Sequence, residues 1–486
     1  MKGTQQFFLN TNKLHKKIWF IAYLTITCWG YSQNFSDIKV NIIRNATNDS
    51  IYKNQIYPVI VEINQQIVLK DFKKRKLQLN LKKGDYNQIF KNLFYQNFKV
   101  YSSNSNNLAK YTFNGKYLKI SLKNKATTTL HINYLFQSDF GMKNNSTTAV
   151  YFIPFMSDWH SWYFTNKSIP LKSVTINIPK EFTLFANKPY SLQNNTYRFQ
   201  THLNDTDVSF YLLDNQYYKK IHFISNGITF NTYLFKNIIV DTVVFNHKDS
   251  LIPHPAKRVS VDFEKNIKAT IDSTTRYLTS IFTDINYPEI NIVEASLSLQ
   301  LDKKQHYTWG RQFQMNQGQA VILIDTSYWQ GNSVQHELIH SFSKMPVDKQ
   351  DSAYYFFAES LVEYLSLVIK YHSADKIDSV FQKRTDKIKA LGYDLDSMPS
   401  IFDISNNYLN LSGTQNQTNI VIYQKVPLLL HHLAKKSGYN QFVWNLCRFF
   451  AVANKSKHVN MPLFEKYIRQ NNLISNQEWQ NFMETL

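Results

Sequence analysis

The chain has 486 residues, 43% of them hydrophobic, and only 12 glycines and 12 prolines. These values exclude a disordered or collagen-like protein and leave room for two or three domains, each with its own core. The formal net charge of +20 suggests an anionic partner, but the lysines are scattered and no nucleic-acid motif is present, so we expect a basic surface and no nucleic-acid partner.

Residues 1–32 have the pattern of a secretory signal peptide. Lys16 and Lys17 precede an apolar run at 18–30, and the small residue Ser32 follows it. The run is too short for a permanent membrane anchor, and no later stretch is long and apolar enough to be one. We therefore expect an exported protein, periplasmic or secreted, whose mature chain has no transmembrane anchor.

Alternation with a period of two predicts an antiparallel β domain over residues 33–225. Hydrophobic residues alternate with polar ones in several short runs, such as Leu77, Leu79 and Leu81, or Val174, Ile176 and Ile178. Successive side chains of a strand point to opposite sides, so each run predicts a strand with one buried face.

The spacing changes to that of helices in residues 226–486. One hydrophobic face runs from Phe263 to Phe282, which predicts the first helix. Strands return at 290–293 and 320–324, and helices dominate after the second of these. This half is therefore predicted to be an α+β domain that ends in short helices.

The segment 333–340 contains the pattern His-Glu-x-x-His on a predicted helix. His336 and His340, four residues apart, project from the same face, so both imidazoles can reach one metal ion. Glu337 lies beside them and can reach a metal-bound water. Two ordinary helix histidines are the alternative, and the composition of the next helix argues against it.

The next predicted helix carries Glu359 and Glu363 one turn apart. A catalytic zinc site takes three protein ligands and keeps one position open, and two histidines with one glutamate are a standard set. We therefore predict one Zn²⁺ per chain, held by His336, His340 and Glu359. Glu363 can accept a hydrogen bond from the other ring N–H of a ligand histidine, with a solvated surface acid as the alternative.

These residues resemble the gluzincin pattern of the membrane-alanyl-aminopeptidase family. The eighteen residues between His340 and Glu359 match the family's spacing, although Ala358 and Ser360 stand where the family usually has asparagine and glycine. The segment that begins at Tyr423 is similar to the family's tyrosine-led helix. The resemblance implies that the Tyr423 hydroxyl stabilises the tetrahedral oxyanion.

The resemblance also implies a fold and an activity. The fold would be an antiparallel β domain, a saddle or sandwich, followed by a thermolysin-like, mainly helical zinc-peptidase domain. The activity would be zinc-assisted hydrolysis of peptides or proteins with Glu337 as general base. Aminopeptidase action is the first expectation and endopeptidase action the second. A catalytically inactive secreted protein that binds a peptide or glycan is the alternative from another class, and the oligomeric state stays open.

One stretch departs from the family. Relatives bind the substrate's free α-amine with a glutamate in the sequence Gly-Ala-Met-Glu-Asn, on a strand before the zinc helix. The corresponding stretch here is 313–318, and alignment on Asn316 and Gly318 places Met315 at the glutamate position. We expect these three residues beside the substrate and a weaker dependence on a free N-terminus, because a buried ammonium without an acid is costly.

Overall fold

The structure is a computed structural model of the whole chain. It describes residues 34–44, 59–70, 76–80, 94–102, 110–114, 117–122, 128–137, 141–144, 147–153, 163–166, 168–186, 190–200, 208, 210–215, 218–235, 263–283, 288–295, 299–302, 305–307, 310–315, 319–325, 332–343, 345–348, 350–390, 392–407, 415–470 and 474–486. The predicted signal peptide at 1–32 lies outside these residues.

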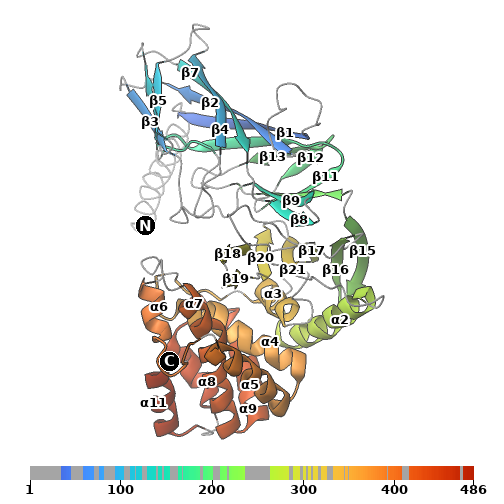
Figure 1. Ribbon diagram of the computed structural model, residues 1–486, viewed down its shortest axis with the longest axis vertical. Coiled ribbons are helices and arrows are strands. Elements are labelled where there is room, and N and C mark those ends of the chain that lie inside the picture. The colour runs from blue at the N-terminus through green and yellow to red at the C-terminus, as the bar shows by residue number, and fades with distance from the viewer. Residues whose placement is uncertain are drawn as a thin grey trace, which may run out of the picture. The chain divides into compact units, whose positions relative to one another are not determined.

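The chain divides into two compact units. The first consists of Met1–Phe140 and Tyr151–Leu212, and the second of Gly141–Val150 and Leu213–Leu486. Strands alone make up the described elements of the first unit, whereas the second unit combines strands with all the described helices (Figure 1). The predicted combination of a β-rich half and a mainly helical half is therefore confirmed.

The first unit is built on a seven-stranded sheet. Its strands, in spatial order, are β12 (Ser191–Gln193), β13 (Thr196–Gln200), β10 (Leu171–Asn177), β1 (Phe35–Arg44), β2 (Val59–Leu69), β7 (Thr128–Gln137) and β4 (Phe94–Ser102). Neighbours are antiparallel except β1 and β10, which run parallel. A smaller sheet contains β3 (Lys76–Asn80), β6 (Tyr117–Ser121) and β5 (Tyr111–Phe113).

The predicted alternation explains how these strands bury one face. Leu77 and Leu79 are almost wholly buried in β3, whereas the residues between and beside them are exposed. They pair with Ile120 and Leu118 of β6, which are equally buried. Of four further strands, β11 (Phe182–Ala186) belongs to the first unit and β8 (Gly141–Asn144) to the second, whereas the division between the units passes through β9 (Thr147–Ile153) and β14 (Phe210–Asp214).

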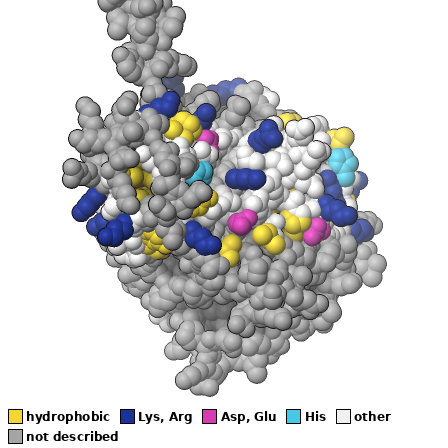
Figure 2. Space-filling view, turned by 90° about the horizontal axis from the view of Figure 1, so that it is seen from above, with side chains coloured by type: hydrophobic (Ala, Val, Ile, Leu, Met, Phe, Trp, Pro, Cys, Tyr) yellow, Lys and Arg dark blue, Asp and Glu magenta, His cyan; other side chains and the backbone are white. Residues whose placement is uncertain are grey.

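The positively charged side chains are scattered over the described part of the surface that Figure 2 shows. On the face in Figure 2, the described lysine and arginine side chains stand among hydrophobic and neutral ones. Among these described residues they form no continuous basic stripe.

The second unit contains a five-stranded sheet. Its spatial order is β15 (Tyr218–Ser225), β16 (Ile228–Phe235), β17 (Glu289–Ala295), β21 (Gln319–Asp325) and β20 (Gly310–Met315), with β20 at an edge. The predicted strands at 290–293 and 320–324 thus exist and lie next to each other, in parallel. A separate hairpin joins β18 (Leu299–Asp302) and β19 (Gln305–Tyr307).

The second unit contains the helices predicted from Phe263 to Phe282, at the His-Glu-x-x-His pattern and directly after it, together with several others. They are α2 (Phe263–Ile281), α3 (Ser333–Phe342), α4 (Leu361–Tyr371), α5 (Ala374–Ala390), α6 (Ile401–Asn407), α7 (Gln415–Ile420), α8 (Val426–Lys436), α9 (Tyr439–Ala453), α10 (Met461–Ile468) and α11 (Asn476–Thr485). Two π-helical turns, η2 (Phe356–Ser360) and η3 (Val421–Lys425), run directly into α4 and α8. None of the described helices combines the length and the apolar composition that crossing a membrane requires.

Phe464 of α10 lies at the centre of the aromatic packing between these helices. Its side chain is fully buried, and its ring meets those of Phe356 and Phe449 edge-on at centroid distances of 5.1 Å. Phe464→Ala should therefore lower the free energy of unfolding of the second unit by about 3–5 kcal/mol, measured by chemical denaturation. Trp444→Ala is the control, because Trp444 is 60% exposed, and it should change stability by less than about 0.5 kcal/mol. Equal denaturation midpoints for the two variants would contradict this account of the core.

Candidate metal centre

Helix α3 places two histidines one turn apart beside the core. Its hydrophobic side chains Leu338, Ile339 and Phe342 are buried and fix the helix against the rest of the unit. His336 and His340 project from one face, and their Nε2 atoms lie 3.1 Å apart. Both imidazoles therefore direct a nitrogen towards the same point.

Glu359, from η2, brings a carboxylate to that point. Its Oε2 lies 3.4 Å from His336 Nε2 and 3.7 Å from His340 Nε2. Zinc bonds of about 2.0–2.1 Å place the ligand atoms of a tetrahedral site about 3.3 Å apart. The three mutual distances match this spacing, so the two nitrogens and one oxygen fit a tetrahedral zinc site with a fourth position left for another ligand.

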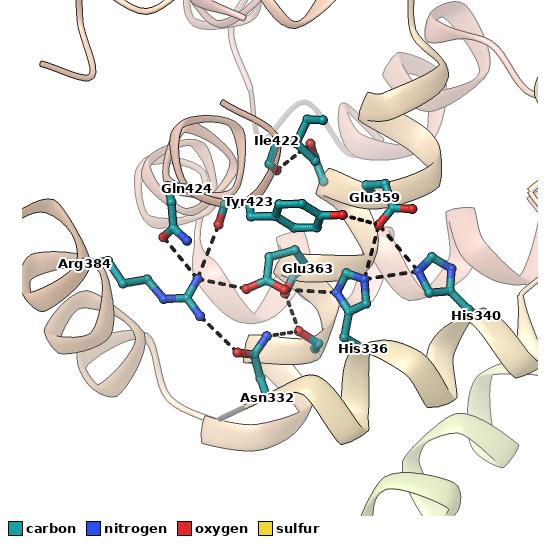
Figure 3. Close-up of polar contacts among 11 residues, drawn as sticks. Asn332, His336, His340, Glu359, Glu363, Arg384, Ile422, Tyr423 and Gln424 are labelled. Atoms are coloured by element: carbon teal, nitrogen blue, oxygen red, sulfur yellow. Dashed lines mark hydrogen bonds and ion pairs between the residues drawn. The ribbon is translucent and has the colours of Figure 1, made fainter. Parts of the chain in front are cut away.

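Glu363, four residues after Glu359 and on α4, fixes the ring of His336. Its Oε2 lies 3.0 Å from His336 Nδ1, on the opposite side of the ring from the nitrogen that faces Glu359 (Figure 3). Because a carboxylate can only accept, Nδ1 carries a proton and donates a hydrogen bond to Glu363, so Nε2 is the ring nitrogen left to bind a metal. Glu363 is nearly buried and is therefore not the solvated surface acid of the alternative interpretation.

Tyr423, from η3, completes the group. Its hydroxyl donates a hydrogen bond of 3.0 Å to Glu359 Oε2 (Figure 3). The two π-helical turns are also joined directly, because the buried Ser360 hydroxyl donates to the Ile422 carbonyl at 2.8 Å. Short π-helical turns are frequent at functional sites, and here each of the two carries one residue of the group.

Glu337 is buried on α3 between the two histidines in sequence, and its negative charge acts on both His336 and Tyr423. Burial alone would lower the pKa of His336, but hydrogen bonds with Glu359 and Glu363 and the charge of Glu337 outweigh it and raise the pKa to about 10. The negative potential that holds a proton on this ring also favours a divalent cation.

The pKa values of the carboxyl groups of Glu363 and Glu359 shift in the opposite direction, downwards. Burial would raise the pKa of Glu363, but its hydrogen bond with His336 and the charge of Arg384 lower it to about 2. Burial would likewise raise the pKa of Glu359, but the charge of His340 and hydrogen bonds with both histidines hold it far below its usual range. Burial and the Glu359 charge raise the pKa of Tyr423, so its hydroxyl keeps its proton. The acids are therefore ionised and the phenol is a donor.

Six residues singled out from the sequence lie in this group, namely His336, Glu337, His340, Glu359, Glu363 and Tyr423. Met315 ends the edge strand β20, but its side chain, and all of Asn316 and Gly318, lie outside the described residues.

Asn332, Arg384 and Gln424 belong to the network but were not predicted from the sequence. Arg384 hydrogen bonds to both of the others and to Glu363. Only Asn332 has a local signal, because it directly precedes the predicted zinc helix in the position of a cap.

No family model and no curated protein sequence matches this chain. Solved structures do match. An aminopeptidase N family protein from Idiomarina loihiensis is 12% identical, with a TM-score of 0.55, over 92% of this chain and 76% of its own. An M1 zinc metallopeptidase from Deinococcus radiodurans is 11% identical, with a TM-score of 0.41, over 93% and 94%. Yeast LTA4 hydrolase, solved with bestatin, is 13% identical, with a TM-score of 0.46, over 94% and 68%.

The Idiomarina loihiensis match shows the fold, because it extends over most of both chains. The fold resemblance to gluzincin aminopeptidases predicted from the sequence is therefore confirmed. At such low identity the likeness concerns the fold alone.

Proposed function

We propose that this chain is an exported zinc metallopeptidase that hydrolyses peptide bonds in the manner of an aminopeptidase. One observation carries the proposal. The donor atoms of His336, His340 and Glu359 lie at the spacing of a tetrahedral zinc site, with the buried Glu337 and the Tyr423 hydroxyl beside them. The fold of an aminopeptidase N family protein supports the choice of a peptide as substrate.

The donor set fits zinc in its chemistry as well as in its spacing. Two imidazole nitrogens and one carboxylate oxygen are ligands that zinc prefers, and three protein ligands leave a position open, as in catalytic sites. When bound, zinc acts as a Lewis acid and lowers the pKa of a bound water to near neutral pH. We expect one ion per chain, held by His336, His340 and Glu359.

Glu337 is the proposed general base. Its carboxylate accepts the proton of the attacking water and returns that proton to the leaving amine. The Tyr423 hydroxyl is the proposed donor to the oxyanion that forms as the carbonyl is attacked. It bonds Glu359 in this structure, and its high pKa keeps the proton that such a contact requires. Glu363 keeps the His336 ring in the orientation in which Nε2 faces the metal position.

Peptide recognition is the finer part of the proposal. We propose that Met315, Asn316 and Gly318 lie beside the substrate, and that Met315 replaces the glutamate with which the family binds the free α-amine. A charged N-terminus then loses its acidic partner, and its binding advantage falls. Export to the periplasm or beyond is proposed from the sequence pattern of residues 1–32.

The test uses one peptide series of equal lengths, with free and with acetylated N-termini, and the zinc-loaded enzyme. If Met315 has removed amine recognition, kcat/KM should be similar for both forms, and internal cleavage products should appear by mass spectrometry. An enzyme whose activity is abolished by acetylation would be a strict aminopeptidase with an acid elsewhere in the amine subsite. A protein that binds zinc and peptides but cleaves neither form would instead be an inactive peptide-binding protein.

A further inference from the structure

Arg384, on α5, makes hydrogen bonds to three separate parts of the metal centre. Its Nη1 lies 2.8 Å from Glu363 Oε1, and its Nη2 donates to Asn332 Oδ1 at 3.0 Å. Nη1 also donates to the Tyr423 carbonyl at 3.4 Å and to Gln424 Oε1 at 3.3 Å. The guanidinium therefore connects the start of α3, helix α4 and the turn η3 (Figure 3).

The contact with Glu363 completes a line of fixed groups that ends at the metal ligands. One oxygen of Glu363 accepts from Arg384 and the other accepts from His336 Nδ1. A carboxylate held through both oxygens cannot rotate without breaking a charge-assisted bond. The orientation of the His336 ring thus depends on Arg384 through Glu363.

The contacts with Tyr423 and Gln424 tie the same guanidinium to the turn η3. They bind the main chain and the next side chain of η3, while the Tyr423 hydroxyl reaches Glu359. One side chain therefore fixes the position of the tyrosine backbone relative to the glutamate that orients a ligand histidine. A lysine cannot reproduce this, because its single nitrogen lacks the planar fork of donors.

We propose that Arg384 is a positioning residue that couples the zinc site to Tyr423. It has two functions, one in metal affinity and one in the placement of Tyr423, and different substitutions can remove them independently. Through Glu363 it supports metal affinity. Through the backbone of η3 it holds the Tyr423 hydroxyl at the place where the oxyanion forms. The second function rests on the proposed peptidase activity, whereas the first does not.

The experiment compares Arg384→Gln, Arg384→Lys and a control, Arg448→Gln. Arg448 is also a partly buried arginine of the second unit, but it bonds Gln470 and lies over the Tyr467 ring. Zinc affinity is measured by chelator competition, melting temperature on the metal-free protein, and kcat and KM on a cleaved peptide. Arg384→Gln should weaken zinc binding by about 10- to 100-fold, the range for loss of a group that orients a ligand.

Arg384→Lys should keep zinc affinity close to wild type, because an ammonium can still pair with Glu363. It should lower kcat by about 10- to 100-fold with little change in KM, since a small misplacement of a catalytic group has effects of this size. In a Tyr423→Phe background the same change should cost much less, because the hydroxyl that Arg384 positions is already absent. Arg448→Gln should leave zinc affinity and kcat unchanged.

Wild-type zinc affinity in Arg384→Gln, together with wild-type kcat in Arg384→Lys, would overturn the proposal. Equal losses in Arg384→Lys and Arg448→Gln would also overturn it, because they would indicate a general effect on stability. If Arg384→Gln does not fold, additivity or coupling between Arg384→Lys and Tyr423→Phe decides the question. A wild-type protein that cleaves no peptide would contradict the proposed function, and the zinc-affinity comparison would still test the link through Glu363.

Discussion

Glu337→Gln should retain zinc and lose hydrolysis. Glutamine has nearly the shape of glutamate and leaves His336, His340 and Glu359 in place, so the metal content should not change. An amide cannot accept the proton of the attacking water, and loss of a general base lowers kcat by about 10² to 10⁴-fold. The measurement is kcat on a cleaved peptide, together with metal analysis of the same preparation.

Glu465→Gln is the matched control for this change. Glu465, on α10, forms an ion pair with Arg469 just after the helix, and none of its described contacts is with a metal ligand. Its replacement should alter neither zinc content nor kcat. Full activity in Glu337→Gln would mean that another group takes the proton and that the role given to Glu337 is wrong.

Glu359→Ala should lose the metal itself. It removes one of three ligand atoms and also the acceptor of the Tyr423 hydroxyl. Loss of a group that merely orients a ligand weakens metal binding by about 10- to 100-fold, so loss of a ligand should weaken it by more than about 100-fold. Chelator competition with zinc measures the change.

Glu363→Ala provides a graded comparison, because Glu363 touches the far side of the His336 ring. Its effect on zinc affinity should lie between wild type and Glu359→Ala. An unchanged zinc affinity in Glu359→Ala would show that a different third ligand holds the ion. If Glu363→Ala weakened zinc binding more than Glu359→Ala, Glu363 would be the ligand.

The parts of the site that could be predicted are those fixed by local geometry. Residues four apart on a helix share a face, so the positions of His336 and His340 followed from the sequence once the helix was recognised. Glu363 relative to Glu359 followed in the same way. The alternation of Leu77 and Leu79 with polar residues likewise fixed which face of β3 is buried.

The parts that could not be predicted depend on packing or on small changes of backbone. Arg384 is 21 positions from Glu363 and 52 from Asn332, and nothing in the sequence around it indicates that α5 brings them together. The turns η2 and η3 differ from an α-helix only in the spacing of their hydrogen bonds, and hydrophobic spacing does not distinguish the two. The role of Met315 rests on alignment with a family, so it stays a prediction.

Within the turn η2, an insertion or deletion would have a different effect from a substitution. A substitution within Phe356–Ser360 changes one side chain and leaves the orientation of α4 unchanged. A residue of α-helix advances by about 100°, so deletion of one residue here would rotate all of α4 by that angle relative to the chain before it. Glu363 would then point away from His336, and Arg384 would lose its ion pair with Glu363. The length of this turn is therefore as much a determinant of the metal centre as the identity of its ligands.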